Sequence, residues 1–408
     1  MKQAFLKKGK EESICRFHPW IFSGAIHHFS EQPEEGEVIQ IFASIPKENE
    51  KGMDFRFVAL GHYQIGSIMV RILAFDDVQI NQSFYENKIK IALQVRIAAG
   101  LFAHSSIEDP LYNNTFRLVH GEGDNLPGLV IDIYGKTAVM QAHSVGMHND
   151  RMMIAHALKA IMKDRIQHIY YKSETTLPYK ADLRQENGFL IGGDKDDIAV
   201  EYGLKFHVDW LKGQKTGFFI DQRENRRLLE MFSNGKRVLN MFCYTGGFSF
   251  YALRGGALLV HSVDSSQKAI DITNLNVKLN FPEDLRHEAF AIDAFKYLND
   301  IQSGQYDLII LDPPAFAKHR DAVKNAMKGY IRLNQKAMEK LKEGGILFTF
   351  SCSQAINKET FRTAVFSAAA KARRTVRILH QLHQPADHPV NIYHPEGEYL
   401  KGFVLYVE

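Results

Sequence analysis

The chain has 408 residues, of which 45% are hydrophobic and 24% charged, and a formal net charge of +3. This composition is typical of globular proteins and excludes a wholly disordered chain, while the length predicts two or three domains. No apolar run reaches the ~18 residues that a membrane span needs, and the start does not resemble a secretion signal, so we expect a cytoplasmic protein. The three cysteines form no Cys-x-x-Cys pair, so we predict neither a disulfide framework nor a metal site.

The mild positive charge permits a polyanionic partner without demanding one. The basic clusters are small, at Lys7–Lys10, Arg226-Arg227 and Arg373-Arg374, and each is compatible with an ordinary solvated surface. Charge alone therefore does not identify a nucleic-acid-binding protein.

Residues 1–74 are typical of short strands separated by turns. Apolar residues alternate in Val38–Phe42 and Phe55–Leu60, and a third run, Ile68–Ile72, follows the turn around Gly66. This pattern predicts a small β-barrel. The aromatic residues near its start, Trp20 and Phe22, are compatible with a place in the barrel core as well as with a binding surface.

Residues 75–195 read as a compact α/β unit, which begins with a strong helical pattern. The predicted helices are 87–102 and 150–163, and the predicted strands are Phe116–His120, Leu129–Ile133, Thr137–Ala142 and Ile166–Tyr171. The segment Glu186–Asp197, rich in Gly and Asp, is expected to be a connector to the next domain.

Residues 196–408 begin with a hairpin that turns at Gly203 and then alternate between short apolar strands and helices. The predicted strands are Arg237–Met241, Leu258–Val263, His287–Ala291, Leu308–Leu311 and Gly345–Phe350, with helices at Ser266–Asn280 and Lys324–Leu341. Short apolar strands joined by helical crossovers predict a parallel, Rossmann-like sheet that is covered on both faces.

Three features point to a nucleoside cofactor at the carboxyl ends of these strands, where such sheets bind ligands. The first strand leads into a glycine turn, 242–248, whose Gly246 and Gly247 allow close approach of the backbone to a ligand. Asp264 closes the second strand, where a carboxylate can hold the two ribose hydroxyls, and Asp293 follows the third, where it can reach an adenine. An NAD site is the alternative, but the turn lacks the Gly-x-Gly-x-x-Gly spacing.

Asp312 and Cys352 follow the fourth and fifth strands and are the candidate catalytic residues. Pro313 and Pro314 stiffen the chain after Asp312, which can hydrogen-bond the edge of a flat heterocycle. A cysteine is often inert core, but a thiol at a strand end and near a helix start can have a lowered pKa. A thiolate that adds to carbon 6 of a pyrimidine activates carbon 5 toward a methyl sulfonium, and Asp312 would stabilise the developing charge.

The other two cysteines are weaker candidates. Cys243 lies in the glycine turn and would face the nucleoside instead of the base, and Cys15 is expected to be structural.

Several blocks of the chain resemble one known family over essentially the whole length. They are Phe17–Ile26, Gly121–Leu129, Gly213–Arg223 and the segments that end in Asp264, Asp293, Asp312 and Cys352. On these blocks the chain resembles the RlmI-like branch of class I methyltransferases, which methylate carbon 5 of a cytosine in 23S ribosomal RNA.

The resemblance implies a PUA-like RNA-binding barrel over 1–74, a central α/β domain over 75–195 and a methyltransferase domain over 196–408. It implies S-adenosylmethionine as cofactor, with Asp264 at the ribose, Asp293 beside the adenine, and the methionine part surrounded by Phe219, Asp221 and the 240–247 turn. The cofactor residues that it implies are Phe219, Asp221, Gln222, Arg223, Asn240, Phe242, Tyr244, Gly246, Asp264, Asp293 and Ala294. The implied partners are 23S rRNA or a ribosomal-subunit precursor, and the family suggests a homodimer.

Two alternatives to cytosine methylation stay open. A related branch methylates guanine at nitrogen 7 and needs no thiol, so Cys352 favours the cytosine branch; a non-catalytic RNA-binding factor would not need the complete set of carboxylates. Other RNA cytosine-5 enzymes carry a second cysteine at the position of Pro314, so Cys352 would have to serve both attack and release.

Overall fold

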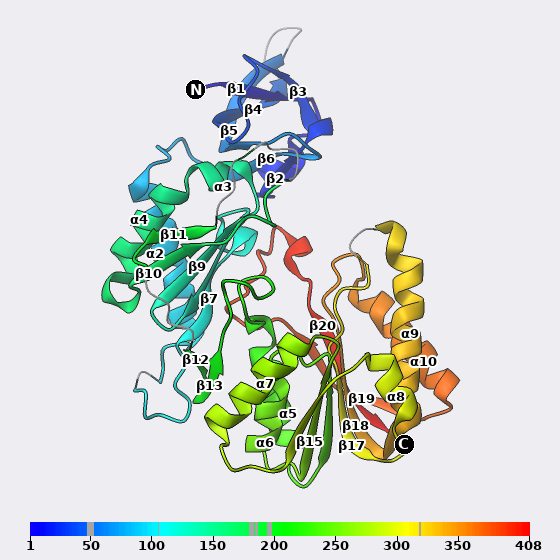
Figure 1. Cartoon of the computed structure of the whole chain (residues 1–408). Coiled ribbons are helices and arrows are strands. Elements are labelled where there is room, and N and C mark those ends of the chain that lie inside the picture. The colour runs from blue at the N-terminus through cyan, green and yellow to red at the C-terminus, as the bar shows by residue number, and fades with distance from the viewer. Residues whose placement is uncertain (47–52, 105, 179–182, 184–186, 194–197, 318–319) are drawn as a thin grey trace. The chain divides into compact units, whose positions relative to one another are not determined.

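The structure is a computed structural model that describes the chain except for residues 47–52, 105, 179–182, 184–186, 194–197 and 318–319 (Figure 1). The chain forms two compact units. The first comprises Met1–Gly203, Val208–Phe218 and Ala386–Gly397, and the second comprises Leu204–His207, Phe219–Pro385 and Glu398–Glu408. The finer division into three domains with boundaries at 74 and 195 stays a prediction.

The N-terminal part of the first unit is a curved six-stranded sheet with the order β2-β6-β5-β4-β1-β3 (Figure 1). Its strands are β1 (Gln3–Leu6), β2 (Trp20–Phe22), β3 (Ile26–Phe29), β4 (Val38–Pro46), β5 (Met53–Tyr63) and β6 (Ile68–Ala74). The predicted alternation is confirmed, because Ile39 and Ile41 on β4 are fully buried and Ile21, Val70 and Ile72 join them in one core.

Three details of this sheet bear on the predictions for Cys15, Phe22 and Trp20. A short helix, α1 (Glu12–Cys15), interrupts the strands and leaves Cys15 exposed, so its assignment as a structural residue is wrong. Phe22 is 48% exposed, so it is not a core residue. Trp20 is half-buried, and its indole N–H donates to Glu122 Oε1 at 2.8 Å.

The rest of the first unit is a five-stranded sheet with the order β11-β10-β9-β8-β7. Its strands are β7 (Thr115–His120), β8 (Leu129–Tyr134), β9 (Thr137–Ala142), β10 (His168–Tyr171) and β11 (Gly188–Ile191), and its helices are α2 (Gln82–Ala98), α3 (Val145–Asn149) and α4 (Arg151–Met162). Strand β11 lies inside the predicted connector, Glu186–Asp197, so the prediction of a connector is wrong for residues 188–191. Residues 186 and 194–197 of this segment are outside the described residues.

The second unit contains a seven-stranded sheet with the order β16-β15-β14-β17-β18-β20-β19. Its strands are β14 (Arg237–Met241), β15 (Leu259–Asp264), β16 (His287–Ala291), β17 (Tyr306–Leu311), β18 (Leu341–Ser351), β19 (Val376–His383) and β20 (Lys401–Val407). Two further short strands flank Gly203 as predicted: β12 (Ile198–Glu201), which belongs to the first unit, and β13 (Leu204–His207), which belongs to the second. The helices are α5 (Arg223–Phe232), α6 (Gly247–Arg254), α7 (Gln267–Asn280), α8 (Ala294–Asp300), α9 (Val323–Lys340) and α10 (Lys358–Ala372).

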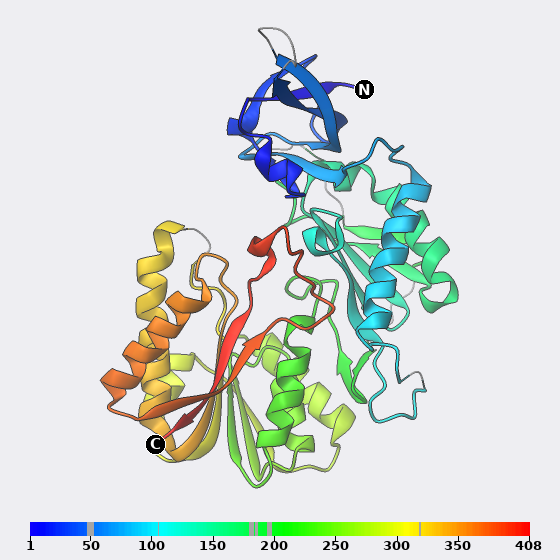
Figure 2. The same ribbon diagram turned by 180° about the vertical axis from the view of Figure 1, so that it is seen from behind.

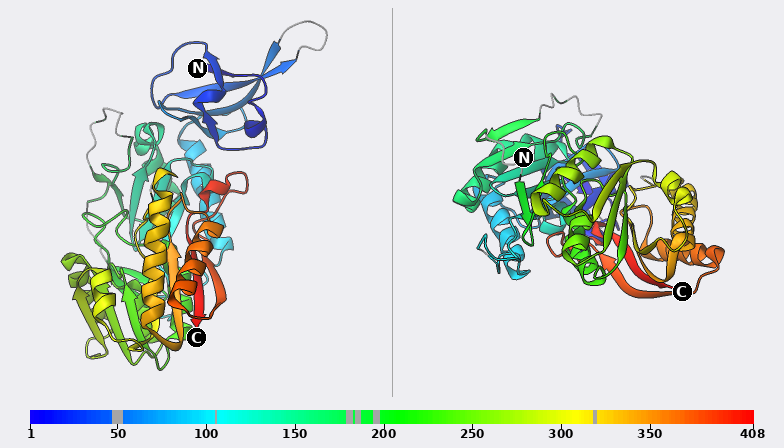
Figure 3. Two further views of the ribbon diagram at one scale, coloured as in Figure 1. Left: turned by 90° about the vertical axis from the view of Figure 1, so that its right-hand side faces the viewer. Right: turned by 60° about the horizontal axis from the view of Figure 1, so that its bottom comes forward.

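Helices cover both faces of this sheet, as predicted (Figure 1). Crossovers between parallel strands are right-handed, so the direction in which the chain moves along the sheet decides which face a helix covers. Helices α6 and α7 connect strands that lead outward from β14 and lie on one face. Helices α8 and α9 connect strands that lead back across β14 and onward, and they lie on the other face. Helices α9 and α10 lie side by side (Figure 3). Residues of α8, α9 and α10 share a core with Leu239 on β14, Ile309 on β17 and Leu347 on β18.

The sheet is parallel only from β16 to β18. The five predicted strands are parallel as expected, whereas β20, which was not predicted, runs antiparallel to both β18 and β19 (Figure 2). The connection from β19 to β20, residues 384–400, contains no α-helical crossover of the kind that parallel neighbours require. No helix among the described residues is long and apolar enough to cross a membrane.

Candidate active site at the carboxyl edge of the sheet

The predicted site residues gather at one edge of the seven-stranded sheet. Asp264 ends β15, and Asp293, Asp312 and Cys352 come one or two positions after the ends of β16, β17 and β18. The strand order reverses between β14 and β17, because the chain runs outward from β14 to β16 and then returns to the other side of β14. Ligands of open α/β sheets bind at such a reversal, so the edge is a candidate active site.

The glycine turn after β14 is held in an uncommon backbone conformation. Phe242, Tyr244 and Gly246 have φ of 59°, 48° and 86°, and positive φ is costly for the two aromatic residues. A Cβ on Gly246 would lie 2.6 Å from the Phe250 ring, so the position requires glycine for space as well as for φ. Backbone strain of this kind persists where the surroundings impose it, as at ligand-binding turns.

Asp264 holds this turn against the end of β15. Its Oδ2 accepts the backbone N–H of Tyr244 at 3.0 Å, and its Oδ1 accepts that of Ser266 at 2.9 Å. Each carboxylate oxygen keeps a further lone pair, so a carboxylate fixed by two backbone donors can still accept a pair of hydroxyl groups.

Phe219 contacts the same turn from another part of the chain, and Asp221, two residues later, lies near Asp312 and Cys352. The Phe219 ring meets that of Tyr244 edge-on, with centroids 5.1 Å apart. Asp221 Oδ2 accepts the Tyr399 hydroxyl at 2.7 Å, while its buried Oδ1 has no hydrogen-bond partner among the described residues. The buried Oδ1 of Asn240, at the end of β14, is likewise without a partner there, although its Nδ2 donates to Ser249 Oγ at 2.9 Å.

Buried polar atoms are normally satisfied, so two open acceptors beside a strained turn indicate a ligand that brings donors. An ammonium group, as in the methionine part of S-adenosylmethionine, has that chemistry. The residues present therefore fit the predicted cofactor.

The other predicted cofactor residues differ in their surroundings. Gln222 is buried, and its Oε1 accepts from Asn225 Nδ2 at 2.7 Å. Arg223 is also buried, with Nε 3.1 Å from Glu224 Oε1. Asp293 is exposed and caps α8 by accepting the Lys296 N–H at 2.9 Å, while Ala294 after it is buried. Asp293 thus has a structural role at the helix start besides the predicted contact with adenine.

Asp312 is a carboxyl group that can act as an acid near neutral pH. Burial, followed by the charge of Asp221, raises its pKa to about 7, whereas a hydrogen bond with Gln222 and the charge of Arg226 act in the opposite direction. A carboxyl group with a pKa near the operating pH is suited to proton transfer.

Cys352 lies against the turn that carries Asp312, with its Sγ 3.9 Å from the Pro313 carbonyl oxygen. The expectation of a lowered pKa is wrong for the protein without ligands. Burial, followed by the charges of Asp312 and Asp221, raises the pKa of the Cys352 thiol to about 12, and the charge of Lys401 only partly offsets this effect. The helix that was expected to help, α10, begins only at Lys358, so its positive end is not adjacent to the thiol.

Cys243 is buried in the glycine turn, with Sγ 3.7 Å from the Tyr244 carbonyl oxygen. Burial, followed by the charge of Asp264, raises the pKa of its thiol. It lies beside the predicted ribose position, so Cys352 is the better candidate nucleophile.

Three residues of this edge were missed from the sequence: Tyr330 on α9, Tyr399 before β20 and Lys401 at the start of β20. The Tyr330 hydroxyl accepts a hydrogen bond at 2.9 Å from Oγ of Ser351, the residue directly before Cys352. Lys401 offered a usable signal in the sequence, because it stands directly before the apolar run Gly402–Leu405. A lysine beside such a run can be expected to be buried, and lysine is rarely buried without a reason.

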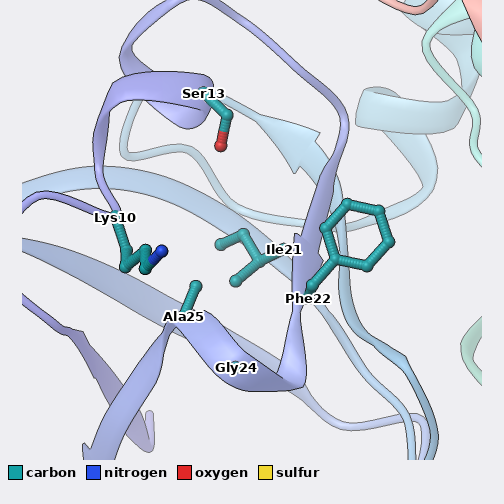
Figure 4. Close-up of a pocket in the computed structure, with 6 residues that line it drawn as sticks. All are labelled: Lys10, Ser13, Ile21, Phe22, Gly24 and Ala25. Atoms are coloured by element: carbon teal, nitrogen blue, oxygen red, sulfur yellow. The ribbon is translucent and has the colours of Figure 1, made fainter.

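The first unit has a separate small hollow, of about 270 Å³, between α1 and the corner after β2 (Figure 4). It is lined by Lys10, Ser13, Ile21, Phe22, Gly24 and Ala25, none of which was predicted to bind the cofactor or to act in catalysis.

Comparisons with known proteins agree with this geometry. Residues 185–394 match the S-adenosylmethionine-dependent methyltransferase family, and residues 5–75 match the PUA-like domain. A solved structure, that of SMU.776 in complex with SAH, shares the fold over 100% of both chains with a TM-score of 0.82 at 22% identity. The fold and the site thus define the class, an enzyme that uses S-adenosylmethionine as cofactor.

Curated relatives narrow the class to one family. The ribosomal RNA large subunit methyltransferase I of Photobacterium profundum is 37% identical over 99% of both chains, and that of Aeromonas hydrophila is 36% identical over 98% of both. The chain therefore belongs to the family of ribosomal RNA large subunit methyltransferase I. This confirms the family predicted from the sequence blocks, the fold class and the cofactor.

Proposed function

We propose that this protein transfers a methyl group from S-adenosylmethionine to carbon 5 of a cytosine in large-subunit ribosomal RNA, through a covalent bond to Cys352. The observation that carries the proposal is the neighbourhood of Cys352 and Asp312. The two residues follow adjacent parallel strands, β18 and β17, and Cys352 Sγ lies 3.9 Å from the Pro313 carbonyl. A thiol and a carboxyl group with a pKa of about 7 are thereby available to one flat base.

The cofactor would be held by the residues around the glycine turn. Asp264 would accept the ribose hydroxyls, and the open Oδ1 of Asp221 would accept the ammonium of the methionine part. The cofactor supplies the methyl group on a positively charged sulfur. The positive charge of the bound cofactor would also lower the pKa of Cys352, because it would offset the charge of Asp221, which is one of the charges that raise this pKa.

Cys352 would begin the reaction as a nucleophile. The thiol gives its proton to water, and its sulfur forms a bond to carbon 6 of the cytosine. The electron pair of the carbon 5–carbon 6 double bond shifts into the ring, and Asp312 in its acid form donates its proton to ring nitrogen 3. Charge that would otherwise build up on the ring is neutralised by this proton.

Carbon 5 then becomes the nucleophile. Its electron pair forms the bond to the methyl carbon that the cofactor would supply, and the cofactor sulfur would keep the electron pair of the bond that it gives up. The proton on carbon 5 leaves to water, its electron pair restores the double bond to carbon 6, and the bond to Cys352 breaks with its electrons on sulfur. Nitrogen 3 returns its proton to Asp312.

The test supplies unmodified 23S rRNA and methyl-labelled S-adenosylmethionine and maps the labelled nucleotide. Label on carbon 5 of a cytosine is expected. Label on guanine nitrogen 7 would contradict the proposal and favour the related branch, and no label on naked RNA or on ribosomal-subunit precursors would favour a non-catalytic RNA-binding factor. Light scattering on the same preparation tests the homodimer that the family suggests.

A further inference from the structure

Lys401 is a buried lysine at the start of β20, next to the candidate nucleophile. In the antiparallel register Lys401 pairs with Ser351, the residue before Cys352. Lys401 is only 7% exposed. Its ammonium donates to the carbonyl oxygen of Ser353, at 2.6 Å, and to that of Ile356. One amino group therefore ties down the loop that begins at Cys352, through the residues one and four positions after it.

The charge of this ammonium is poorly compensated. Among the described residues it forms no ion pair with a carboxylate; its direct partners are two neutral carbonyl groups. A buried cation without a counter-ion is costly, and apolar residues of similar size could fill the same space. The cost is explained if a negative charge develops beside Lys401 during function.

We propose that Lys401 is a positioning residue for Cys352, whose ammonium fixes the loop after the thiol and stabilises its thiolate form. The inference rests on the proposed role of Cys352 as the nucleophile. It assigns to Lys401 the charge that the start of a helix was expected to supply. The thiolate would become the counter-ion of Lys401 when the proton leaves Cys352.

The other charged and titratable groups around the thiol make the positive charge of Lys401 important for the thiolate form of Cys352. Asp312 after β17 and Asp221 before α5 both oppose ionisation of Cys352, and Tyr330 on α9 is close enough for the thiolate to raise the pKa of its phenol. Lys401 is the positive charge that favours the thiolate. Burial lowers the pKa of Lys401 itself to about 8, while the charges of Cys352 and Glu398 act in the opposite direction.

The test follows alkylation of Cys352 by iodoacetamide in the full chain, with the peptide that carries Cys352 quantified by mass spectrometry between pH 6.5 and 9.5. The rate is proportional to the thiolate fraction, which rises about tenfold per pH unit well below the thiol pKa. In the wild type this rise should flatten around pH 8, where Lys401 loses its charge and the pKa of Cys352 increases. In Lys401→Met the flattening should be absent, and the rate at pH 7 should be roughly tenfold lower.

Lys340 offers a matched control. Its ammonium also donates to two backbone carbonyls, those of Asn299 and Ile301, at the opposite end of α9 from the site. Lys340→Met removes the same kind of loop contact and should leave the alkylation profile of Cys352 unchanged. Lys401→Arg, which keeps a positive charge that does not titrate in this range, should react faster than Lys401→Met and show no flattening.

Two outcomes would overturn the inference: a wild-type profile without flattening near pH 8, or a Lys401→Met rate equal to that of the wild type. The wild-type profile needs no variant, so it decides the matter even if Lys401→Met fails to fold. The readout does not depend on the RNA target. Label on a purine would refute the proposed function, whereas an unchanged alkylation profile would refute only the role of Lys401.

Discussion

The thiol of Cys352 shares its surroundings with two carboxyl groups, Asp312 and Asp221, and these groups resist the ionisation that the reaction requires. The raised pKa of about 12 keeps the thiol protonated, and so unreactive toward other electrophiles, in the protein without ligands. The cofactor cation, the base and Lys401 would together provide the conditions for the thiolate. Activation of the nucleophile would thus be coupled to assembly of the complete site.

Asp312→Asn should separate the two effects of this carboxyl group. Removal of its negative charge lowers the pKa of Cys352, so alkylation of Cys352 should be faster than in the wild type. Methylation should nevertheless fall by roughly 10²–10⁴-fold, because an amide cannot give a proton to the ring nitrogen. Alkylation kinetics and single-turnover methylation check the two directions. Slower alkylation would show that the charge of Asp312 does not act on the thiol.

At the scale of residues, the sequence predicted positions better than electrostatics. The strand ends placed Asp264, Asp312 and Cys352 at one edge, because a strand of apolar residues has a visible end. The pKa of Cys352 was predicted in the wrong direction, because burial and the charges of Asp312 and Asp221 raise it, and no local pattern shows how deeply the thiol is buried or that Asp221 lies near it. Pairing between Lys401 and Ser351 is a matter of register that no local pattern reveals.

The glycine turn after β14 is the element on which cofactor binding should depend most. Gly246→Ala forces a Cβ to within 2.6 Å of the Phe250 ring and places alanine at φ 86°. The left-handed conformation alone costs about 1–2 kcal/mol. We expect the affinity for S-adenosylmethionine, measured by calorimetry, to fall by roughly tenfold or more as the turn shifts.

Gly235→Ala is the control for this variant. Gly235 also has a positive φ, 69°, but a Cβ there meets nothing within 4 Å. It should lower stability slightly and leave cofactor affinity unchanged. Equal losses of affinity in the two variants would show that the shape of the turn is not specific to the cofactor.

In the first unit, the segment after β7 depends on a buried ion pair. Arg96 on α2 is fully buried and binds both oxygens of Asp124, which also accepts the His120 backbone N–H at 2.6 Å. Asp124→Ala leaves the guanidinium uncompensated, so the free energy of unfolding should fall by about 3–5 kcal/mol. Urea unfolding followed by tryptophan fluorescence measures this, because both tryptophans, Trp20 and Trp210, belong to the first unit.

The exposed pair of Glu12, at the start of α1, and Arg16, directly after its end, supplies the comparison. Glu12→Ala should change the same free energy by less than about 1 kcal/mol. A loss in Asp124→Ala as small as that in Glu12→Ala would contradict the importance of the buried pair.

Elements were predictable where burial made them periodic or continuously apolar. Strand β14 was predicted with its observed bounds, and β17 and β18 within a few residues, because a strand covered on both faces is a run of apolar residues. Strand β16 was also predicted with its observed bounds, although it lies at the edge of the sheet and none of its residues is buried. Strand β19 was missed because most of its residues are exposed and it alternates poorly. Helix α1 was missed because four residues are too few to show a helical period.

At the scale of the whole molecule, the family and the fold class followed from motifs spread over the chain, and the comparisons confirm both. The grouping of segments did not follow from the sequence. Ala386–Gly397 belongs to the first unit although the chain on either side of it belongs to the second. Its Asp387 accepts the Arg117 backbone N–H at 3.0 Å, a contact across 270 positions of sequence that no local pattern predicts.

The proposed covalent bond between Cys352 and a cytosine can be tested with the target RNA in which 5-fluorocytidine replaces cytidine. After methyl transfer, carbon 5 would carry fluorine and no proton, so the bond to Cys352 could not be released. We expect a stable enzyme–RNA complex that forms only with S-adenosylmethionine, maps to the peptide containing Cys352, and is lost in Cys352→Ala. Methylation of normal RNA by Cys352→Ala should also fall by roughly 10³-fold or more. Normal methylation by Cys352→Ala, or a trapped complex at another residue, would contradict it.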